Sequence, residues 1–345
     1  MSHLQLVLWS GLLIGLIFGA AGQASRFCLQ RGLVQRWSRS GGGQLQAFAL
    51  ALCIAILGTQ ALAAGGWVEL DDSLYLMPAY SWLLIPLGGL MFGYGMALAN
   101  GCGARALVLL GQGNLRSLVV LLCLAVAAYM TLTGVLAPWR VALSELTTVR
   151  PAHLSPVIGW TRLALVGVVS LVLLTYALRQ GAWRRHLPAL IGGAIVGQLV
   201  VAGWLVTGWL GADDFDPVPV VSLTFVAPIG DTLQYAMIAT GMELRFGIVV
   251  VTGVVIGAFL AAALRKELRL QGFDTPHDMM RYIGGGLLMG SGGALALGCS
   301  IGQGLTGLST LSYSSMLAAV TIVAGARLRW SQVRQKELRA AAAVS

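Results

Sequence analysis

Long apolar stretches alternate with short polar segments along nearly the whole chain. Each stretch approaches the length of about 20 residues that a helix needs to cross a bilayer. There are nine, at residues 4–24, 44–65, 80–100, 115–137, 157–178, 187–208, 244–264, 281–298 and 311–328. The pattern predicts an all-α polytopic membrane protein with about nine transmembrane helices in a single membrane domain, residues 1–345.

The polar segments differ sharply in the sign of their charge. Residues 26–39, 179–186 and 265–281 are rich in arginine, whereas residues 67–79 and 209–224 carry acids and no base. Because basic loops stay on the cytoplasmic side of a membrane, we expect the N-terminus outside and the C-terminus in the cytoplasm. The expected location is the bacterial inner membrane.

One motif occurs twice, 197 positions apart, and each copy ends on Gly-Cys. Residues 88–102 read GGLMFGYGMALANGC and residues 285–299 read GGLLMGSGGALALGC, with ten of fifteen positions identical. Counted through the predicted spans, the two copies cross the membrane in opposite directions. Inverted repeats of this kind are typical of secondary transporters, whose site lies at the repeat interface.

This duplication predicts how the membrane domain is organised. The expected parts are a first repeat, a linking helix, an inverted second repeat and a basic cytoplasmic tail. They cover residues 1–137, 157–178, 187–328 and 329–345, in that order.

The apolar segments that follow the two motifs are too short to be spans. Residues 101–113 and 298–307 are glycine-rich and fit short re-entrant helices, and residues 25–33 and 225–241 form a second candidate pair in matching places. Broken backbone at membrane depth is tolerated only where it is buried in protein or lines a cavity. Four such segments converging from both faces predict an hourglass shape.

Cysteines stand beside these predicted helix starts. The free N–H groups of a first helical turn carry about half a positive charge and attract anions. Cys102 and Cys299 end the two motifs, and Cys28 lies in the earlier segment. A buried thiol is neutral and polarisable, so it could hold a soft sulfur atom loosely enough to release it. The alternative is a small residue at a tight helix crossing, but the equivalence of Cys102 and Cys299 favours a function.

Five further residues are candidates for the substrate pathway. Gly101 and Gly298 permit the sharp turn and the close approach that a half-helix start requires. Arg105 is either a functional cation or a side chain that reaches back to the cytoplasmic interface. Asn100 and Gln303 could donate hydrogen bonds to an oxyanion or satisfy the broken backbone.

Composition narrows the class of protein. Hydrophobic residues make up 57% of the chain and charged residues 10%, against about 25% charged residues in soluble domains. The net charge of +9 does not indicate nucleic-acid binding, because the basic residues stand in short loops. Five cysteines without a CxxC pair, and only four histidines, predict no metal and no cofactor. The bilayer and a small anion are the expected partners.

Three stretches carry a resemblance to a known family. At residues 25–28 (SRFC), 100–114 (NGCGARALVLLGQGN) and 298–312 (GCSIGQGLTGLSTLS), the chain resembles the YeeE/YedE family of sulfur-transport membrane proteins. The resemblance covers essentially the whole chain and implies thiosulfate uptake through an hourglass of long and short helices. It also implies that Cys102 and Cys299 pass the anion by transient S–H to sulfur contacts.

Two further expectations come from this resemblance. Family members often work with a small cytosolic sulfurtransferase of the TusA type, and the Arg-rich cytoplasmic face is compatible with such docking. A further central thiol is expected in the second half, but residues 225–264 contain no cysteine. Cys28 or another residue of that segment would have to supply the third contact.

Uptake of thiosulfate or a related sulfur anion by a protein that is not an enzyme is therefore the leading hypothesis. One alternative is transport of another sulfur or selenium species. A membrane-embedded sulfurtransferase using a cysteine thiolate is a second, but it needs an adjacent base, and no histidine lies near either motif. Asp231 could couple protons, although capping of a short helix is the favoured interpretation.

Overall fold

The nine predicted stretches all contain helices. The computed structural model describes residues 3–77, 79–149, 160–179, 186–212 and 218–344. The long helices are α1 (His3–Ser25), α3 (Gln44–Ala64), α4 (Leu84–Leu98), α6 (Leu115–Leu132), α8 (Trp160–Leu178), α10 (Leu187–Leu205), α12 (Phe246–Leu264), α13 (Pro276–Leu295) and α14 (Tyr313–Val344). Five helical stretches of the described chain are long and apolar enough to cross a membrane. The all-α membrane class is confirmed, and the number of nine spans stays a prediction.

Four shorter elements begin inside the protein. They are α2 (Leu29–Trp37), α5 (Gly103–Gly111), α11 (Val226–Ile238) and the π-helical turn η6 (Gly302–Gly307). Three of them follow the end of a long helix within a few residues, and α11 follows a non-helical segment. Three of them, α5, α11 and η6, fall within the segments predicted to be re-entrant, whereas α2 begins in the predicted segment 25–33 and continues beyond it to Trp37. The residues that precede α2, α5 and α11 are buried, so these helices start away from both faces.

The sequence did not predict the structure around residues 80 and 140. Helix α7 (Ala137–Thr147) packs against α6 and α4 but has no buried residue. Strand β1 (Tyr80–Ser81) pairs antiparallel with β2 (Thr148–Val149), so the stretch predicted from residue 80 becomes helical only at Leu84. Short turns complete the described elements: η1 (Leu70–Asp72), η2 (Leu74–Leu76), η4 (Val206–Leu210) and η5 (Ala239–Gly241).

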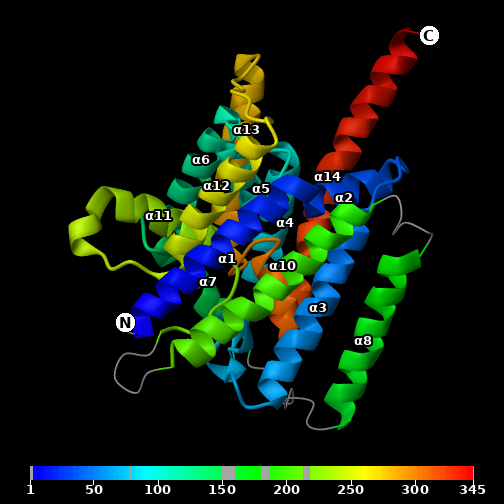
Figure 1. The fold of residues 1–345 in the computed structure, drawn as a ribbon. Coiled ribbons are helices and arrows are strands. Elements are labelled where there is room, and N and C mark those ends of the chain that lie inside the picture. Colours follow the sequence, from blue (N-terminus) through cyan, green and yellow to red (C-terminus); the bar gives the residue numbers. More distant parts are fainter. Residues whose placement is uncertain (1–2, 78, 150–159, 180–185, 213–217, 345) are drawn as a thin grey trace.

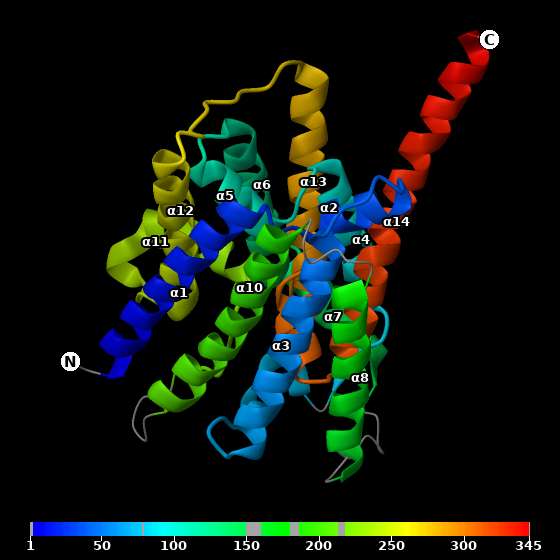
Figure 2. The ribbon, with the colours of Figure 1, turned by 45° about the vertical axis from the view of Figure 1, so that its right-hand side comes forward.

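The helix packing repeats itself between the two halves. Helix α1 packs along α12, and α3 packs along α10. In the same way α4 packs on α14, α13 packs on α6, and α4 and α13 pack on each other (Figures 1 and 2). Exchanging α1 with α10, α3 with α12, α4 with α13 and α6 with α14 turns each contact into its counterpart. The contacts therefore fit an internal repeat; its inversion in the membrane stays a prediction.

Glycines let these helices approach backbone to backbone. A Cβ at Gly93 of α4 would collide with the carbonyl oxygen of Ile322 in α14. In α1, a Cβ at Gly19 would meet the carbonyl oxygen of Val254 in α12 in the same way. Small residues at such crossings are the usual basis of helix association in lipid, where the hydrophobic effect gives no net attraction between helices.

Basic and acidic segments lie at opposite ends of α3. The chain between α2 and α3 carries Arg39, and Trp37 beside it stacks near Trp330 of α14 at a centroid distance of 5.7 Å. At the other end of α3, Trp67 lies 5.6 Å from Trp209, next to the acidic residues 69–72. The predicted charge separation is thus present among the described residues. Arg184, Arg185, Asp213, Asp214, Asp216 and residues 157–159 lie outside them.

The close α4–α14 crossing yields a stability prediction. Gly93→Ala should lower the thermal stability of the purified protein by about 1–3 kcal/mol, because the added methyl group overpacks a backbone contact. The matched control is Gly167→Ala on α8, where a Cβ meets nothing within 4 Å. Unfolding midpoints in detergent report both variants, and equal midpoints would contradict the packing argument.

Candidate functional site

Three cysteines from separate breaks come together in the interior. Cys28 precedes α2, Cys102 precedes α5, and Cys299 stands between α13 and η6. Their exposed fractions are 5%, 3% and 1%. Cys102 lies within electrostatic interaction range of both of the others. Cys102 is thus the middle thiol of a row that runs from Cys28 to Cys299.

The turns that place these thiols have the same geometry in both halves. The Gly101 N–H donates to the Met96 carbonyl at 3.0 Å, and the Gly298 N–H donates to the Gly293 carbonyl at 2.9 Å. These bonds close the ends of α4 and α13 as Schellman motifs, whose turning residue has left-handed backbone and is usually glycine. Here that residue is Asn100, with φ of 58°, and Leu297, with φ of 56°.

Backbone N–H groups point at the sulfur atoms. The Gly302 N–H donates to Sγ of Cys299 at 3.2 Å. The backbone groups of Gln30 and Arg31, in the first turn of α2, lie near the Cys28 sulfur and act on its charge. Cys28 and Cys102 occupy the N-cap positions of α2 and α5. The thiols therefore sit at helix starts, where the partial positive charge attracts anions.

A cavity leads from the basic end of the protein to Cys28. It measures about 570 Å³. Its wall combines residues of α2, α5, the start of α6 and the segment before α13: Cys28, Gln30, Arg31, Val34, Gln35, Ala99, Asn100, Gly101, Arg105, Ala106, Leu109, Asn114, Arg116, Ser117, Val120, Gln271 and Tyr282. A further pocket of about 10 Å³ lies deeper, between Cys28, Cys102 and Ile301. Cys28 and Arg105 line both, so they mark the inner end of the cavity.

Arg105 is a half-buried cation without a counter-ion among the described residues. Its Nη1 atom is buried and has no hydrogen-bond partner, and no ion pair involves this side chain among the described residues. The groups that act on its charge most strongly are the thiols of Cys28 and Cys102 and the cations Arg31 and Arg26. A guanidinium in this setting favours an anionic ligand, because a buried charge without a partner is costly.

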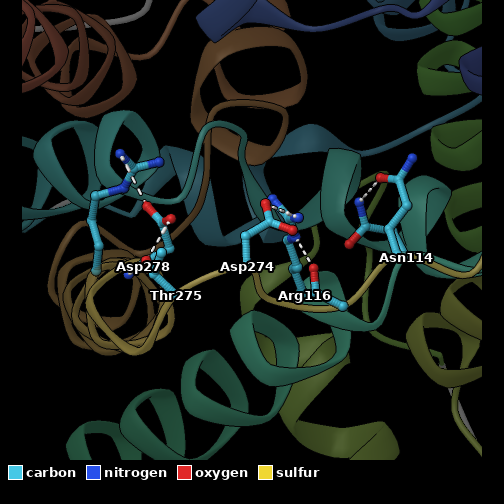
Figure 3. Close-up of polar contacts among 8 residues, drawn as sticks. Asn114, Arg116, Asp274, Thr275 and Asp278 are labelled. Atoms are coloured by element: carbon cyan, nitrogen blue, oxygen red, sulfur yellow. Dashed lines mark hydrogen bonds and ion pairs between the residues drawn. The ribbon is translucent and has the colours of Figure 1, made fainter.

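The rim of the cavity is fixed by paired polar groups (Figure 3). Arg116 donates to Asp274 at 2.7 Å and also to the Gly272 carbonyl, and the Asn114 amide donates to Gln271 at 3.0 Å. These contacts tie the turn between α5 and α6 to the segment before α13. Arg116 is therefore neutralised at the mouth, in contrast to Arg105 inside.

The two candidate amide residues have different surroundings. Asn100 is exposed and lines the large cavity. Gln303 is 1% exposed, and its Nε2 donates to the carbonyls of Ala296 and Leu297 at 2.7 and 3.2 Å. Both amide hydrogens of Gln303 thus satisfy backbone at the end of α13. The sequence left two roles open for Gln303, donation to an oxyanion or to unpaired backbone carbonyls. In this structure its amide donates to backbone carbonyls.

Asp231 does not cap a helix. It lies within α11, whose N-cap position is Phe225, and its carboxylate accepts a hydrogen bond from the Tyr129 hydroxyl. The favoured interpretation of Asp231 as a capping residue was therefore wrong. A short polar side chain can pair with a neighbouring helix as readily as with its own first turn, and the sequence does not distinguish the two.

The further thiol expected in the second half is absent, and a phenylalanine stands at the position equivalent to Cys28. Phe225 precedes α11 as Cys28 precedes α2, and the two residues are 197 positions apart. Phe225 is fully buried and its ring lies 5.1 Å from that of Phe18. The spacing of the repeat could have identified Phe225 as the counterpart of Cys28.

These features together are those of an integral membrane protein built around a buried, anion-attracting centre. A family model described as "Sulphur transport" matches residues 24–328. The chain therefore belongs to this family, the YeeE/YedE family of sulfur-transport membrane proteins, as its motifs predicted.

Curated relatives extend along nearly the whole chain. A thiosulfate transporter of Escherichia coli K12, TsuA, is 24% identical over 92% of this chain and 92% of its own length. The TsuA thiosulfate transporter of Spirochaeta thermophila is 26% identical over 92% of this chain and 97% of its own length. Both support transport of a sulfur anion as the activity of this family.

The strained turn at Leu297 yields a second prediction. Leu297→Asn should raise the stability of the protein by up to about 1 kcal/mol, because asparagine adopts left-handed backbone more readily than a branched apolar residue. Leu297→Ala is the control, since it shortens the side chain and keeps the Cβ. A thermal midpoint of Leu297→Asn no higher than that of Leu297→Ala would contradict the strain argument.

Proposed function

We propose that this chain takes up thiosulfate across the bacterial inner membrane, along a central path of thiols and short-helix starts. The observation that carries the proposal is the row Cys28, Cys102 and Cys299, with the unpaired Arg105 beside its first two members. The relatives of Escherichia coli and Spirochaeta thermophila, both described as thiosulfate transporters, support this choice among sulfur anions.

The chemistry of the row suits an anion with a soft terminal sulfur. A neutral thiol can donate an S–H bond to that sulfur, and helix-start N–H groups add partial positive charge to the path. None of these contacts is as strong as a buried ion pair. Conduction requires such a balance, because each site must bind well enough to accept the anion and weakly enough to pass it on.

The membrane arrangement we propose follows the charges and the repeat. Residues 1–137 and 187–328 form inverted repeats about a linking helix at residues 157–178, nine helices cross the bilayer, and short helices narrow the middle to an hourglass. The N-terminus lies outside and the basic tail, residues 329–345, inside. The paired helix contacts and the separation of charged segments along α3 support this arrangement. The large cavity then opens to the cytoplasm.

A cytosolic sulfurtransferase of the TusA type is the acceptor we propose. Its support is the position of the cavity, which reaches Cys28 from the end of the protein where basic residues gather. A carrier thiolate at the cavity mouth would attack the outer sulfur of thiosulfate after the anion's last contact with Cys28 and Arg105. A persulfide forms on the carrier as the S–S bond of thiosulfate breaks, and sulfite leaves.

Growth on thiosulfate tests the proposed substrate. A bacterium that lacks sulfate uptake should grow on thiosulfate as sole sulfur source when it expresses this chain. Its growth on cysteine serves as the control for general fitness. Good expression without growth on thiosulfate would contradict thiosulfate uptake and point to another sulfur or selenium species.

Removal of each thiol tests the row. Cys28→Ala, Cys102→Ala and Cys299→Ala should each reduce uptake of labelled thiosulfate by about ten-fold or more, because one contact along a single path is lost. Cys53→Ala is the control: Cys53 is also buried, but its sulfur bonds to the Ser170 carbonyl in α8. Unchanged uptake in all three variants, with normal insertion, would rule out a relay of thiols.

The two arginines of the cavity should respond differently to neutralisation. Arg105→Gln should raise the KM for thiosulfate uptake by about ten-fold or more, because losing one charge-assisted contact of about 1.5–3 kcal/mol corresponds to roughly 10- to 150-fold. Arg116→Gln removes the same charge from a residue already paired with Asp274, so its KM should change much less. Equal effects in initial-rate uptake assays would contradict the role of the unpaired cation.

A further inference from the structure

The outer half of the thiol row has no counterpart of Arg105. The residue 197 positions after Arg105 is Gly302. A Cβ at Gly302 would lie 2.6 Å from Oγ1 of Thr224 and 3.3 Å from the hydroxyl oxygen of Tyr75. Two neutral hydroxyl groups therefore occupy the space that a side chain would fill at this position.

Tyr75 reaches this place from the acidic end of the protein. It belongs to the turn η2, in the segment between α3 and α4. Its neighbours on the chain are open to the surroundings, since Leu74 is 40% and Met77 is 49% exposed. Tyr75 itself is 6% exposed. Val68, Leu70 and Ser73 of the same segment are also buried. The segment thus alternates between exposed and inserted side chains, and Tyr75 is the inserted side chain that reaches Gly302.

The contacts of Tyr75 place it over the last thiol of the row. Its side chain lies within electrostatic interaction range of Cys299, and its hydroxyl lies beside that of Thr224. Its ring meets the edge of Trp204 at a centroid distance of 6.2 Å. Its carbonyl accepts a hydrogen bond of 2.6 Å from Ser312. Every one of these contacts is between neutral groups, so the segment can leave without separating an ion pair.

We infer that Tyr75 is the outer gate of the thiol path, an inference that rests on the proposed uptake function. In this structure the gate is closed over Cys299, while the cavity at Cys28 is open toward the basic end. Withdrawal of the tyrosine ring exposes Cys299 to the outside. The hydroxyls of Tyr75 and Thr224 then offer hydrogen bonds to the oxygens of an entering anion before it reaches Cys299.

Access to Cys299 from outside tests the gate without measuring transport. Spheroplasts are treated with an impermeant, negatively charged methanethiosulfonate, and mass spectrometry of peptides measures modification of Cys299 over time. Tyr75→Ala should speed this modification by about ten-fold or more, because thiol reaction rates follow access. Tyr75→Phe keeps the ring and should stay within about two-fold of the parent.

Two controls separate the gate from general loosening. Leu74→Ala shortens an exposed side chain of the same turn and should leave the rate unchanged. Ser312→Ala removes the shorter of the two hydrogen bonds to the Tyr75 carbonyl, which also accepts from Ser314 at 3.4 Å. It leaves Tyr75 unaltered and should speed modification even if Tyr75→Ala fails to reach the membrane. No acceleration in either Tyr75→Ala or Ser312→Ala would overturn the gate. If the unaltered chain does not support growth on thiosulfate but Tyr75→Ala still speeds modification of Cys299, the uptake proposal is overturned and the gate is not.

Discussion

Helices that break inside a membrane leave backbone groups that no water can satisfy, and the rest of this structure depends on how those groups are paired. The carbonyl of Ser25, at the end of α1, accepts from the Gln44 amide at 2.9 Å. In the other half, the carbonyl of Leu223 accepts from the Thr306 hydroxyl at 2.7 Å. A buried group left unpaired costs about 1–3 kcal/mol. Buried polar side chains beside the breaks are therefore part of the framework that makes the breaks possible.

The same breaks supply the chemistry of the site. Pairing the carbonyl ends leaves the first-turn N–H groups of the short helices free to face the thiols, as Gly302 faces Cys299. The two halves then use one backbone arrangement for different purposes. One half places Cys28 and Arg105 where the other places Phe225 and Gly302. The surroundings of the thiols thus differ between the two halves, with cationic groups near Cys28 and aromatic and hydroxyl groups near Cys299.

The sequence predicted helices better than it predicted contacts. Hydropathy located every long helix, because burial in lipid imposes a continuous apolar run, and the motif at Cys102 and Cys299 located both broken turns. The sequence did not predict α7, which has no buried face. It also did not predict the insertion of Tyr75, whose neighbours Leu74 and Met77 are exposed. The pairing of Arg116 with Asp274 and the isolation of Arg105 were equally out of reach. These facts depend on which segments meet in space, and local pattern carries no information about that.

The unpaired Arg105 has a limited energetic role in the proposed uptake. Moving an anion with two negative charges into a cell that is negative inside costs about 4.6 kcal/mol per 100 mV of membrane potential. A fixed guanidinium near Cys28 lowers the energy of the anion while it is bound there, and so reduces a barrier. It cannot change the free-energy difference between the two sides, because the anion must leave it again. Net accumulation therefore requires a step beyond the chain's own thiols and cations, and removal of the sulfur by a cytosolic acceptor at the open cavity would supply it.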